Sequence, residues 1–377
     1  MKNYGFASLQ DFLGDRILFR NLNALDPALP RLDDLRKDVN LSPNIIPRKT
    51  SLDYARVIIE LVKQARRQDG NPADIRHIIY VGDTRMNDGM AFRNICASAH
   101  WRGAAMIIAE DDELSKLDQE QDENSIIFFN NHWVNLRVFH LLLQMKEIEL
   151  NEETVVLIDV DKTALGARGR NDAVIDEARV KAAQTVLQEI LDYTFDVDEF
   201  VRVYSTLNQP AYHPFTGDNQ DYLVYICLIL LSGLFKLEDI VTDAHLGLLS
   251  NFDSFIDQVE QRCIDLPVGV WEVHHEIYHL VKCGDATPFK QFRKMEYHTT
   301  SARMGQLPCQ SSIEELLQQE ILITREVQEF AVRCRKAGAT LFGLSDKPDE
   351  ASVSFSQDEN LKSLHQISTH VVGAKNE

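Results

Sequence analysis

TVVLIDVDKTALG, residues 154–166, is the stretch that decides which fold the sequence predicts. The apolar run 155–158 predicts a buried parallel strand, with Asp159 at its carboxyl end, where open α/β sheets bind their ligands. Alternation along an extended chain points Asp159 and Asp161 to the same side. One carboxylate can then attack while the other transfers a proton, a pairing that suits phosphoryl transfer. The simpler alternative is a strand that happens to end in an Asp-rich turn.

Strands and helices alternate around this segment. Strands are predicted at 76–81, 104–109, 125–129, 155–158 and 339–344. Helices are predicted at 51–67 and 88–99, and the acidic segment 111–124 is expected to be a solvated loop. This alternation predicts an α/β protein with a Rossmann-like parallel sheet and right-handed crossovers.

A long helical region separates the last two predicted strands. Its expected helices are 173–193, 222–235, 252–263, 270–281 and 313–336. A mainly helical domain inserted between two strands of one sheet is the simplest architecture. Residues 1–166 and 325–377 are therefore expected to form the core, and residues 167–324 the inserted domain. The first forty residues predict only short helices and irregular packing.

Composition narrows the class of protein. The chain has 377 residues, of which 44% are hydrophobic, enough for two cores. The formal charge of -19 disfavours nucleic acids and anionic membranes as partners. The apolar stretch 222–235 has about 14 residues where a membrane span needs roughly 20. The first fifteen residues lack a signal segment, and six cysteines without a CxxC pair predict reduced thiols, so a cytoplasmic protein is expected.

Two further phrases place polar side chains after predicted strands. In IIYVGDTRMNDGM, residues 78–90, Gly82 permits a tight turn, and Asp83 and Asp88 follow in the loop. Carboxylates at a strand end suit Mg²⁺, which prefers one or two carboxylates together with water and substrate phosphate. In GLSDKP, residues 343–348, Ser345 follows a strand.

These phrases resemble the motifs of the haloacid dehalogenase (HAD) superfamily, which consists mostly of magnesium-dependent phosphatases. DxDxT at 159–163 looks like the first motif, and GDTRMND at 82–88 looks like the longer form of the fourth. Ser345 is similar to the serine of the second motif; Ser205 competes for that place but lies in the helical region. Lys49, one helix before the fourth motif, has the placement of the motif lysine.

The resemblance implies a mechanism and a set of site residues. Asp159 would attack phosphorus and form an aspartyl phosphate, while Asp161 would act as general acid and then as general base. The implied phosphate-binding residues are Thr163, Ser345 and Lys49. The implied Mg²⁺ ligands are Asp159, Asp161 through its backbone carbonyl, Asp83 and Asp88. The expected substrate is a small phosphorylated molecule.

The motif order is a cyclic rotation of the order in the family. Lys49 comes first, the Asp83 phrase second, the Asp159 phrase third and Ser345 last. Circular permutation is physically permitted, because domain termini tend to lie close together at the surface. The helical region 167–324 then takes the position of a HAD cap domain. The sequence leaves open whether one chain completes its site or a second copy in a homo-oligomer supplies half of it.

Two rival interpretations stay open. HEIYH, with His275, Glu276 and His279, matches the HExxH pattern of zinc hydrolases, and the nearest third ligands are Glu296 and His298. A non-catalytic protein that keeps the HAD-like fold is the second rival.

A basic cluster follows the HEIYH segment. It contains Lys290, Arg293 and Lys294. These side chains are expected either to bind the leaving group of an anionic substrate or to form a solvated helical face.

Overall fold

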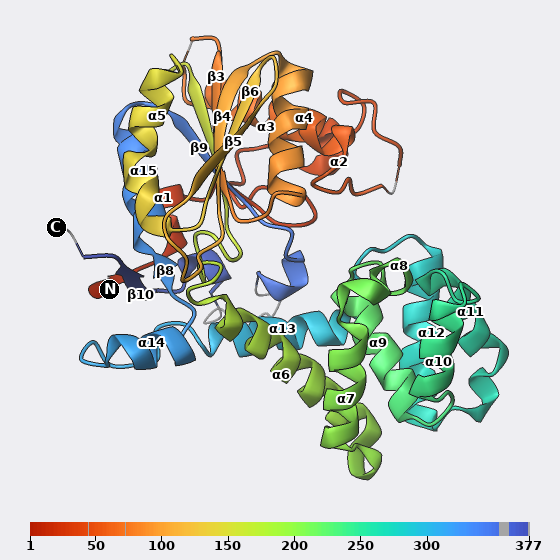
Figure 1. Ribbon diagram of the computed structural model, residues 1–377. Coiled ribbons are helices and arrows are strands. Elements are labelled where there is room, and N and C mark those ends of the chain that lie inside the picture. The colour runs from red at the N-terminus through yellow and green to blue at the C-terminus, as the bar shows by residue number, and fades with distance from the viewer. Residues whose placement is uncertain (44, 72, 354–361, 376–377) are drawn as a thin grey trace. The chain divides into compact units, whose positions relative to one another are not determined.

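The computed structural model describes residues 1–43, 45–71, 73–353 and 362–375 (Figure 1). The chain divides into two compact units. The first contains residues 1–177 and 300–377, and the second contains residues 178–299. The second unit is thus shorter at both ends than the stretch 167–324 that the sequence sets apart, because residues 300–324 pack with the first unit.

A seven-stranded sheet forms the centre of the first unit, in the order β2-β9-β7-β3-β4-β6-β5. Its strands are β2 (Ile17–Leu18), β9 (Thr340–Leu344), β7 (Thr154–Asp159), β3 (His77–Gly82), β4 (Arg102–Ile108), β6 (Ser125–Asn130) and β5 (Leu117–Gln121). All neighbours pair in parallel except β5 and β6. The predicted α/β class with a mostly parallel sheet is confirmed.

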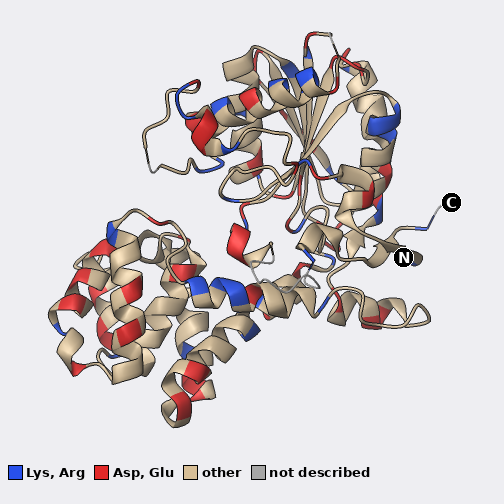
Figure 2. Ribbon diagram, turned by 180° about the vertical axis from the view of Figure 1, so that it is seen from behind, with Lys and Arg blue, Asp and Glu red and all other residues tan. Residues whose placement is uncertain are grey.

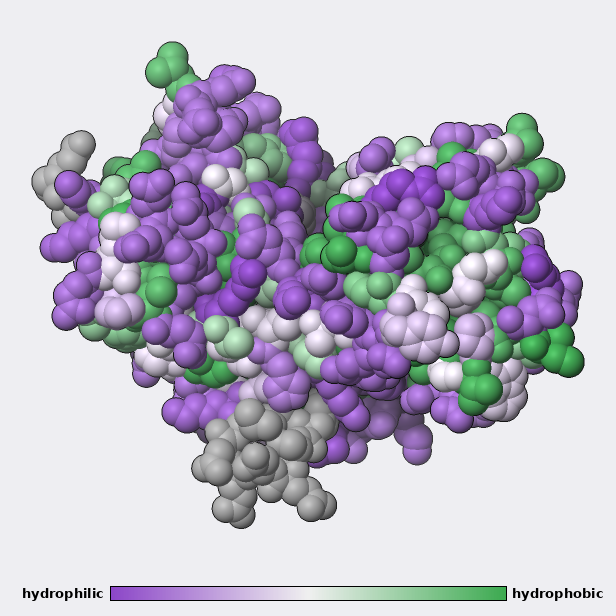
Figure 3. Space-filling view, turned by 90° about the horizontal axis from the view of Figure 1, so that it is seen from below, coloured by the Kyte–Doolittle hydropathy of each residue, from purple (hydrophilic) through white to green (hydrophobic). Residues whose placement is uncertain are grey.

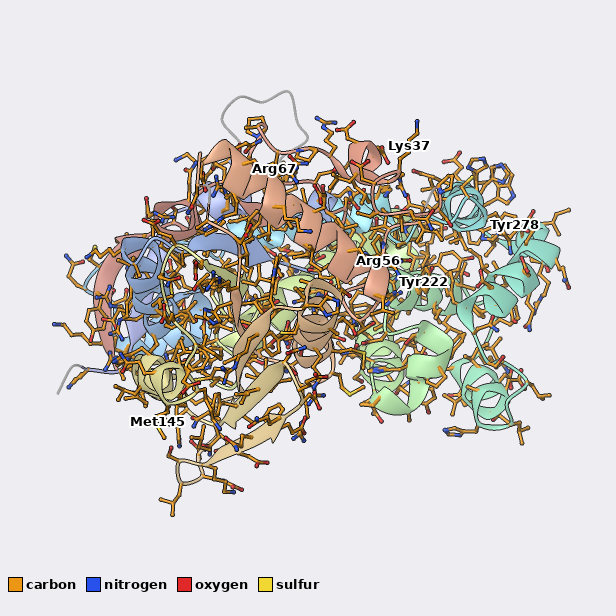
Figure 4. The ribbon with its side chains drawn as sticks, turned by 90° about the horizontal axis from the view of Figure 1, so that it is seen from above. Lys37, Arg56, Arg67, Met145, Tyr222 and Tyr278 are labelled. Carbon is orange, nitrogen blue, oxygen red and sulfur yellow. The ribbon has the colours of Figure 1, made fainter. Side chains whose placement is uncertain are left out.

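Helices cover both faces of this sheet. Figure 1 shows α3 (Leu52–Gln68) and α4 (Asn87–Ala99) on one face, and α5 (Phe139–Met145) and α15 (Arg325–Lys336) on the other. Helix α3 buries its apolar stripe and points Arg56 and Arg67 outward from its other face (Figure 4). The strands between these layers carry almost no charged residues along their length (Figure 2). Two-sided burial explains why β3, β7 and β9 are continuous apolar runs.

The segment 111–124, expected to be a loop, contains strand β5. Its residues are polar and mostly exposed, so no apolar pattern marks it in the sequence. Antiparallel pairing with β6 holds it at the edge of the sheet. Glu120 of β5 also forms ion pairs with Arg85 and Arg93. The loop prediction was therefore wrong.

The helix predicted at 313–336 is also wrong, because a strand interrupts it. The chain forms α14 (Ile313–Gln319), β8 (Ile323–Thr324) and then α15. The side chain of Asn171 binds the backbone at this interruption. Its Nδ2 donates to the carbonyls of Leu317 and Glu320, and its Oδ1 accepts from the amide of Leu322. Backbone groups that bond outside the segment cannot close helical turns.

A second, three-stranded sheet has the order β1-β10-β8, from β1 (Lys2–Ala7), β10 (Thr369–Gly373) and β8. Strands β1 and β10 pair antiparallel, so the two end segments of this chain lie side by side. Neither strand was predicted, because their short runs show no clear apolar alternation.

The second unit is helical. Its helices are α6 (Asp172–Leu191, shared with the first unit), α7 (Val197–Leu207), α8 (His213–Thr216), α9 (Gln220–Leu231), α10 (Leu237–His245), α11 (Phe252–Gln261), α12 (Val268–Lys282) and α13 (Lys290–Ser301, also shared). Helix α9 falls within the predicted helix 222–235 except at its first two residues, and it is buried on all sides. Its Tyr222 stacks on Phe252 with ring centroids 3.8 Å apart.

No helix among the described residues combines the length and the apolar character that a membrane crossing requires. The surface of the helical unit mixes apolar and polar residues (Figure 3). Its exposed apolar residues include Tyr193, Ile264 and Val268.

Candidate functional site

The candidate site lies where three neighbouring strands of the large sheet end. Strands β9, β7 and β3 are parallel neighbours, so their carboxyl ends share one edge of the sheet, as the sequence predicted. The chain passes from β3 to β4 and β6 on one side and then returns to β7 on the other side. Asp83 and Asp159 follow the two strands at which this direction reverses, the position where open α/β sheets form a ligand crevice.

Asp159 ends strand β7 and is 4% exposed. Its Oδ1 accepts a hydrogen bond of 2.6 Å from Lys49 Nζ. Its Oδ2 is buried and has no hydrogen-bond partner among the described residues. Buried carboxylate oxygens normally have a partner, because an unsatisfied one retains the full cost of its lost hydration. This oxygen is therefore available as a ligand atom.

Lys49 reaches the edge of the sheet from the segment that precedes α3. Its Nζ lies 2.6 Å from Asp159 Oδ1 and 2.6 Å from Asp88 Oδ1, and the side chain is 4% exposed. Arg20 holds the backbone before it, since its Nη1 donates to the carbonyl of Pro47 at 3.0 Å. Asn94 holds the backbone after it through the carbonyl of Thr50 at 2.9 Å. The ammonium is thus fixed between two carboxylates 71 positions apart in the sequence, Asp88 and Asp159.

Asp88 is fully buried, and protein donors occupy both of its carboxylate oxygens. Oδ1 accepts from Lys49 and, at 2.9 Å, from Tyr80 Oη. Oδ2 accepts from the amide of Asp83 at 3.1 Å and from the amide and hydroxyl of Thr84 at 2.9 and 2.8 Å. The predicted metal ligand Asp88 is therefore better described as the group that holds Lys49 and the loop after β3.

Gly82 makes room for Asp88. A Cβ built on Gly82 would lie 2.6 Å from Asp88 Cγ, closer than real side chains approach. Gly82 does not have a positive φ, so the tight turn expected from the sequence is not the reason for this glycine. The reason is the close passage of a buried carboxylate over the backbone.

Asp83 lies at the same edge and is 7% exposed. Its Oδ2 accepts a hydrogen bond from Arg168 Nε. One carboxylate oxygen of each of Asp83, Asp88 and Asp159 lies within 4.8 Å of the others. Among the described residues, this is the one group of three or more candidate ligands compact enough for a metal ion.

Crowding shifts the pKa values of these groups. Burial and the neighbouring Asp88 raise the pKa of Asp83 to about 7, although Arg168 acts against the shift. Burial also raises the pKa of Asp159 well above its ordinary value, and Lys49 offsets this only in part. Burial alone would raise the pKa of Asp88 too, but Lys49 and the Thr84 donors outweigh it and hold that pKa at about 2. The pKa of Lys49 is raised, because Asp159 and Asp88 outweigh its burial.

Asp161 and Ser345 meet on the β9 side of the site. Ser345 Oγ donates to Asp161 Oδ2 and accepts from the amide of Lys347 at 3.0 Å. Between the two aspartates and the next helix, Lys162 adopts a φ of 62°, a left-handed conformation that is uncommon outside glycine and is concentrated at functional sites. The structure thus brings together six predicted residues at this edge of the sheet: Lys49, Asp83, Asp88, Asp159, Asp161 and Ser345.

Thr163 does not join this group through any hydrogen bond among the described residues. It is fully buried, its Oγ1 has no partner among them, and its carbonyl accepts from Thr324 Oγ1 at 2.5 Å. Thr163 therefore ties the loop after β7 to β8. Its predicted contact with phosphate gains no support from these bonds.

The basic residues predicted in the helical region are not equivalent. Arg293 is buried and pairs with Asp221 and Glu296, so its guanidinium already has two carboxylate partners and is unsuited to grip a substrate. Lys290 Nζ lies 2.8 Å from Asp285 Oδ2. Lys294 is exposed on α13. For Arg293, these ion pairs give no support to the expected contact with a substrate.

The HEIYH residues lie on α12. His275, Glu276 and His279 are exposed, and His275 stacks on Trp271 with ring centroids 5.4 Å apart. The candidate third ligand Glu296 is buried in its pairs with Arg293 and Arg179. No histidine belongs to a compact group of three ligands among the described residues.

Tyr80 and Arg168 contribute to the site, as Thr84 does, and no motif in the sequence marks them. Tyr80 lies inside strand β3, where its sequence position predicts an ordinary aromatic residue of the core. Its hydroxyl nevertheless donates a hydrogen bond to Asp88. Arg168 lies in a loop nine residues after Asp159, and only its proximity to the first motif could have drawn attention to it.

The cluster fits a divalent cation. Asp83, Asp88 and Asp159 carry three negative charges when ionised, and Lys49 compensates one, which leaves two. Hard carboxylate oxygens match the preference of Mg²⁺, and the unpartnered Asp159 Oδ2 offers it a ligand. Asp83 and Asp159 would hold the ion, since the oxygens of Asp88 are already bonded.

Fold and site together define an α/β protein whose mostly parallel sheet carries a carboxylate cluster at the carboxyl ends of its central strands. Comparisons with protein-family models, with curated proteins and with solved structures give no match for this chain.

Proposed function

We propose that this protein is a Mg²⁺-dependent phosphohydrolase that cleaves small phosphate monoesters through an aspartyl-phosphate intermediate. One observation carries the proposal: Lys49, Asp83 and Asp159 come from three distant segments and meet around a buried, unpartnered carboxylate oxygen. These are the residues that the HAD resemblance selects in a rotated motif order. Random matches to short motifs would have no reason to converge in space.

In the first step Asp159 attacks phosphorus. The P–O bond to the ester oxygen breaks as the bond to the Asp159 carboxylate forms. Asp161 donates its proton to the leaving oxygen, which departs as an alcohol. Lys49 keeps its charge throughout and offsets the negative charge that would otherwise hold a phosphate away from Asp159.

In the second step water hydrolyses the aspartyl phosphate. Asp161, now ionised, takes a proton from the water as the water oxygen attacks phosphorus. The bond between phosphorus and the Asp159 oxygen breaks, and inorganic phosphate leaves. Asp159 is again a carboxylate and Asp161 is again protonated, so the site is ready for another cycle. Ser345, hydrogen-bonded to Asp161, fixes the orientation of this acid and base.

Bound Mg²⁺ would supply electrostatic stabilisation of the phosphoryl oxygens. Asp83 and Asp159 would hold it, together with the backbone carbonyl of Asp161. We further propose that the first unit is a permuted HAD-like core and that residues 178–299 serve as the cap domain that selects the substrate.

A binding protein without turnover is the alternative that shares the same site. The short contact between Ser345 and Asp161 favours the enzyme, because it orients a second carboxylate that simple phosphate binding does not need. A zinc hydrolase has less support, since the HEIYH histidines are exposed and lack a third nearby ligand among the described residues.

Release of phosphate from a panel of phosphate monoesters tests the proposal. Asp159→Asn should keep the fold, shown by an unchanged circular dichroism spectrum, and lose at least about a thousandfold in turnover, because an amide is a poor nucleophile. Asp118→Asn is the matched control, since Asp118 is an exposed carboxylate on the edge strand β5. Near-wild-type turnover in Asp159→Asn would refute the mechanism. No Mg²⁺-dependent turnover of any ester by the wild type would favour the binding protein.

A further inference from the structure

Arg168 is a cation of the candidate site that neither the sequence motifs nor the proposed mechanism assigns. Its Nε donates to Asp83 Oδ2, and this is the one hydrogen bond of its side chain among the described residues. The side chain is 35% exposed, whereas Asp83 is 6% exposed. The guanidinium thus contacts a buried candidate metal ligand while it is itself partly exposed to solvent.

Several hydrogen bonds hold the backbone of Arg168, whereas one holds its side chain among the described residues. Its carbonyl accepts from the amide of Glu110 and from Trp133 Nε1, both at 3.1 Å, and its amide donates to the carbonyl of Lys162 at 2.7 Å. The next residue, Gly169, has a φ of +76°, and a Cβ there would lie 1.8 Å from the carbonyl oxygen of Glu110. Because the backbone of residues 168 and 169 is held in place, the Arg168 side chain can change its partner by rotation about its own bonds, without movement of the loop.

The charges of the site favour such an exchange. Without metal, Arg168 compensates one of the two negative charges that remain after Lys49 is counted. A divalent cation at Asp83 and Asp159 would compensate both, and would compete with Arg168 for the Asp83 carboxylate. The displaced guanidinium would keep Asp172 and Asp176 as nearby carboxylates. Its planar fork would be able to bind two oxygens of a phosphate.

We propose that Arg168 is a substrate-binding residue that pairs with Asp83 in the metal-free protein and transfers to the phosphoryl group once Mg²⁺ is bound. This inference rests on the proposed function and adds a phosphate-contacting residue to it. A purely structural role is less suited to Arg168, because the neighbouring Arg170 already ties this loop to Glu110 and Glu326.

Calorimetric titration of Arg168→Gln with Mg²⁺ alone, and then of the Mg²⁺-loaded protein with inorganic phosphate, tests the exchange. The variant should bind Mg²⁺ about fivefold more tightly, because a competing ion pair is gone. It should bind phosphate at least about tenfold more weakly, because charge-assisted hydrogen bonds are lost. Arg48→Gln is the matched control: Arg48 is exposed beside Lys49, so the same charge is removed near the site. Both constants should change less than twofold there.

Thermal unfolding separates the exchange from a structural role. Arg168→Gln should lower the Tm in EDTA and leave it unchanged, relative to the wild type, in saturating Mg²⁺. Equal Mg²⁺ affinity in the Arg168 and Arg48 variants, or equal loss of Tm with and without Mg²⁺, would overturn the inference while the proposed function stands. A wild-type chain that binds no Mg²⁺ would overturn both.

Discussion

At the scale of single residues, the site depends on how one buried carboxylate is accommodated. Asp88 passes so close to Gly82 that no other residue type fits beneath it. In return, Asp88 supplies one of the two partners of Lys49 and five hydrogen-bond contacts to β3, its loop and Lys49. The identity of residue 82 therefore controls the position of Lys49.

We expect Gly82→Ala to displace Asp88 and with it Lys49. The variant should lose about 1–3 kcal/mol of unfolding free energy, the usual cost of overpacking, and most of its phosphatase activity. Urea unfolding and turnover of a phosphate ester measure the two effects. Gly89→Ala is the control: its Cβ would meet only Ile127 Cδ1 at 3.6 Å, and it lies within helix α4. That variant should be at least as stable as the wild type, since alanine favours helix. Equal behaviour of both variants would contradict this account.

At the scale of elements, helices α9, α11 and α12 of the second unit share a buried polar contact. His274 of α12 is fully buried, with its Nδ1 2.6 Å from Tyr225 Oη and its Nε2 2.8 Å from Glu260 Oε2. Burial lowers the pKa of His274, although Glu260 acts in the opposite direction and His275 in the same direction. The folded chain therefore keeps this ring neutral more strongly than the unfolded chain does.

This shift predicts the pH dependence of stability. Because the pKa of His274 is lower in the folded state, the unfolded state binds more protons as the pH falls below about 6.5, the ordinary histidine value. The stabilisation from neutral His274 is present above that pH and is lost as the pH falls through the lowered pKa. Urea unfolding of the wild type between pH 7.5 and 5 should show this loss.

His274→Gln isolates the effect. This variant should be less stable than the wild type at pH 7.5, and its stability should change less with pH. His279, an exposed histidine of the same helix, provides the control, since it is not among the groups that shift the pKa of His274 and His279→Gln should keep the wild-type pH dependence. Identical pH profiles for the wild type and His274→Gln would show that His274 does not titrate as described.

At the scale of the whole molecule, the carboxylate cluster links metal binding to the stability of one unit. All three acids and Lys49 belong to the unit of residues 1–177 and 300–377. In the metal-free chain, burial and the mutual repulsion of these carboxyl groups oppose folding of that unit, and the same two effects raise the pKa values of Asp83 and Asp159. A cation that binds only the folded state stabilises it by mass action.

We therefore expect Mg²⁺ to raise the unfolding temperature of this unit. At a free concentration one hundred times its Kd, the gain in unfolding free energy should be about 2.7 kcal/mol. Differential scanning calorimetry with Mg²⁺ and with EDTA measures it. Asp159→Asn should respond much less, and His274→Gln, which alters the other unit, should respond as the wild type does. A full Mg²⁺ response in Asp159→Asn would place the ion elsewhere.

The sequence predicted the strands correctly where a local apolar pattern marks them. Strands β3, β4, β6, β7 and β9 are apolar runs buried on both faces, and each was predicted within about two residues. The polar edge strand β5 and the two-residue strand β8 have no such pattern. They exist because β6 and β10 offer free edges and because Asn171 binds the backbone around β8. The partners of β8 lie far along the chain, and β5, although it directly precedes β6, is too polar and exposed for an apolar pattern to mark it.

The sequence by itself determined the α/β class, the central strands and the candidate acids, because apolar periodicity and short motifs are properties of neighbouring residues. Only the tertiary structure decided which charged groups meet. In the folded chain Lys49 forms ion pairs with Asp88 and Asp159. Asp83 pairs with Arg168, and Arg293 forms a buried ion pair with Asp221. Such pairings depend on distance and burial in space, since a charge is stabilised by what surrounds it after folding and not by its neighbours in the chain.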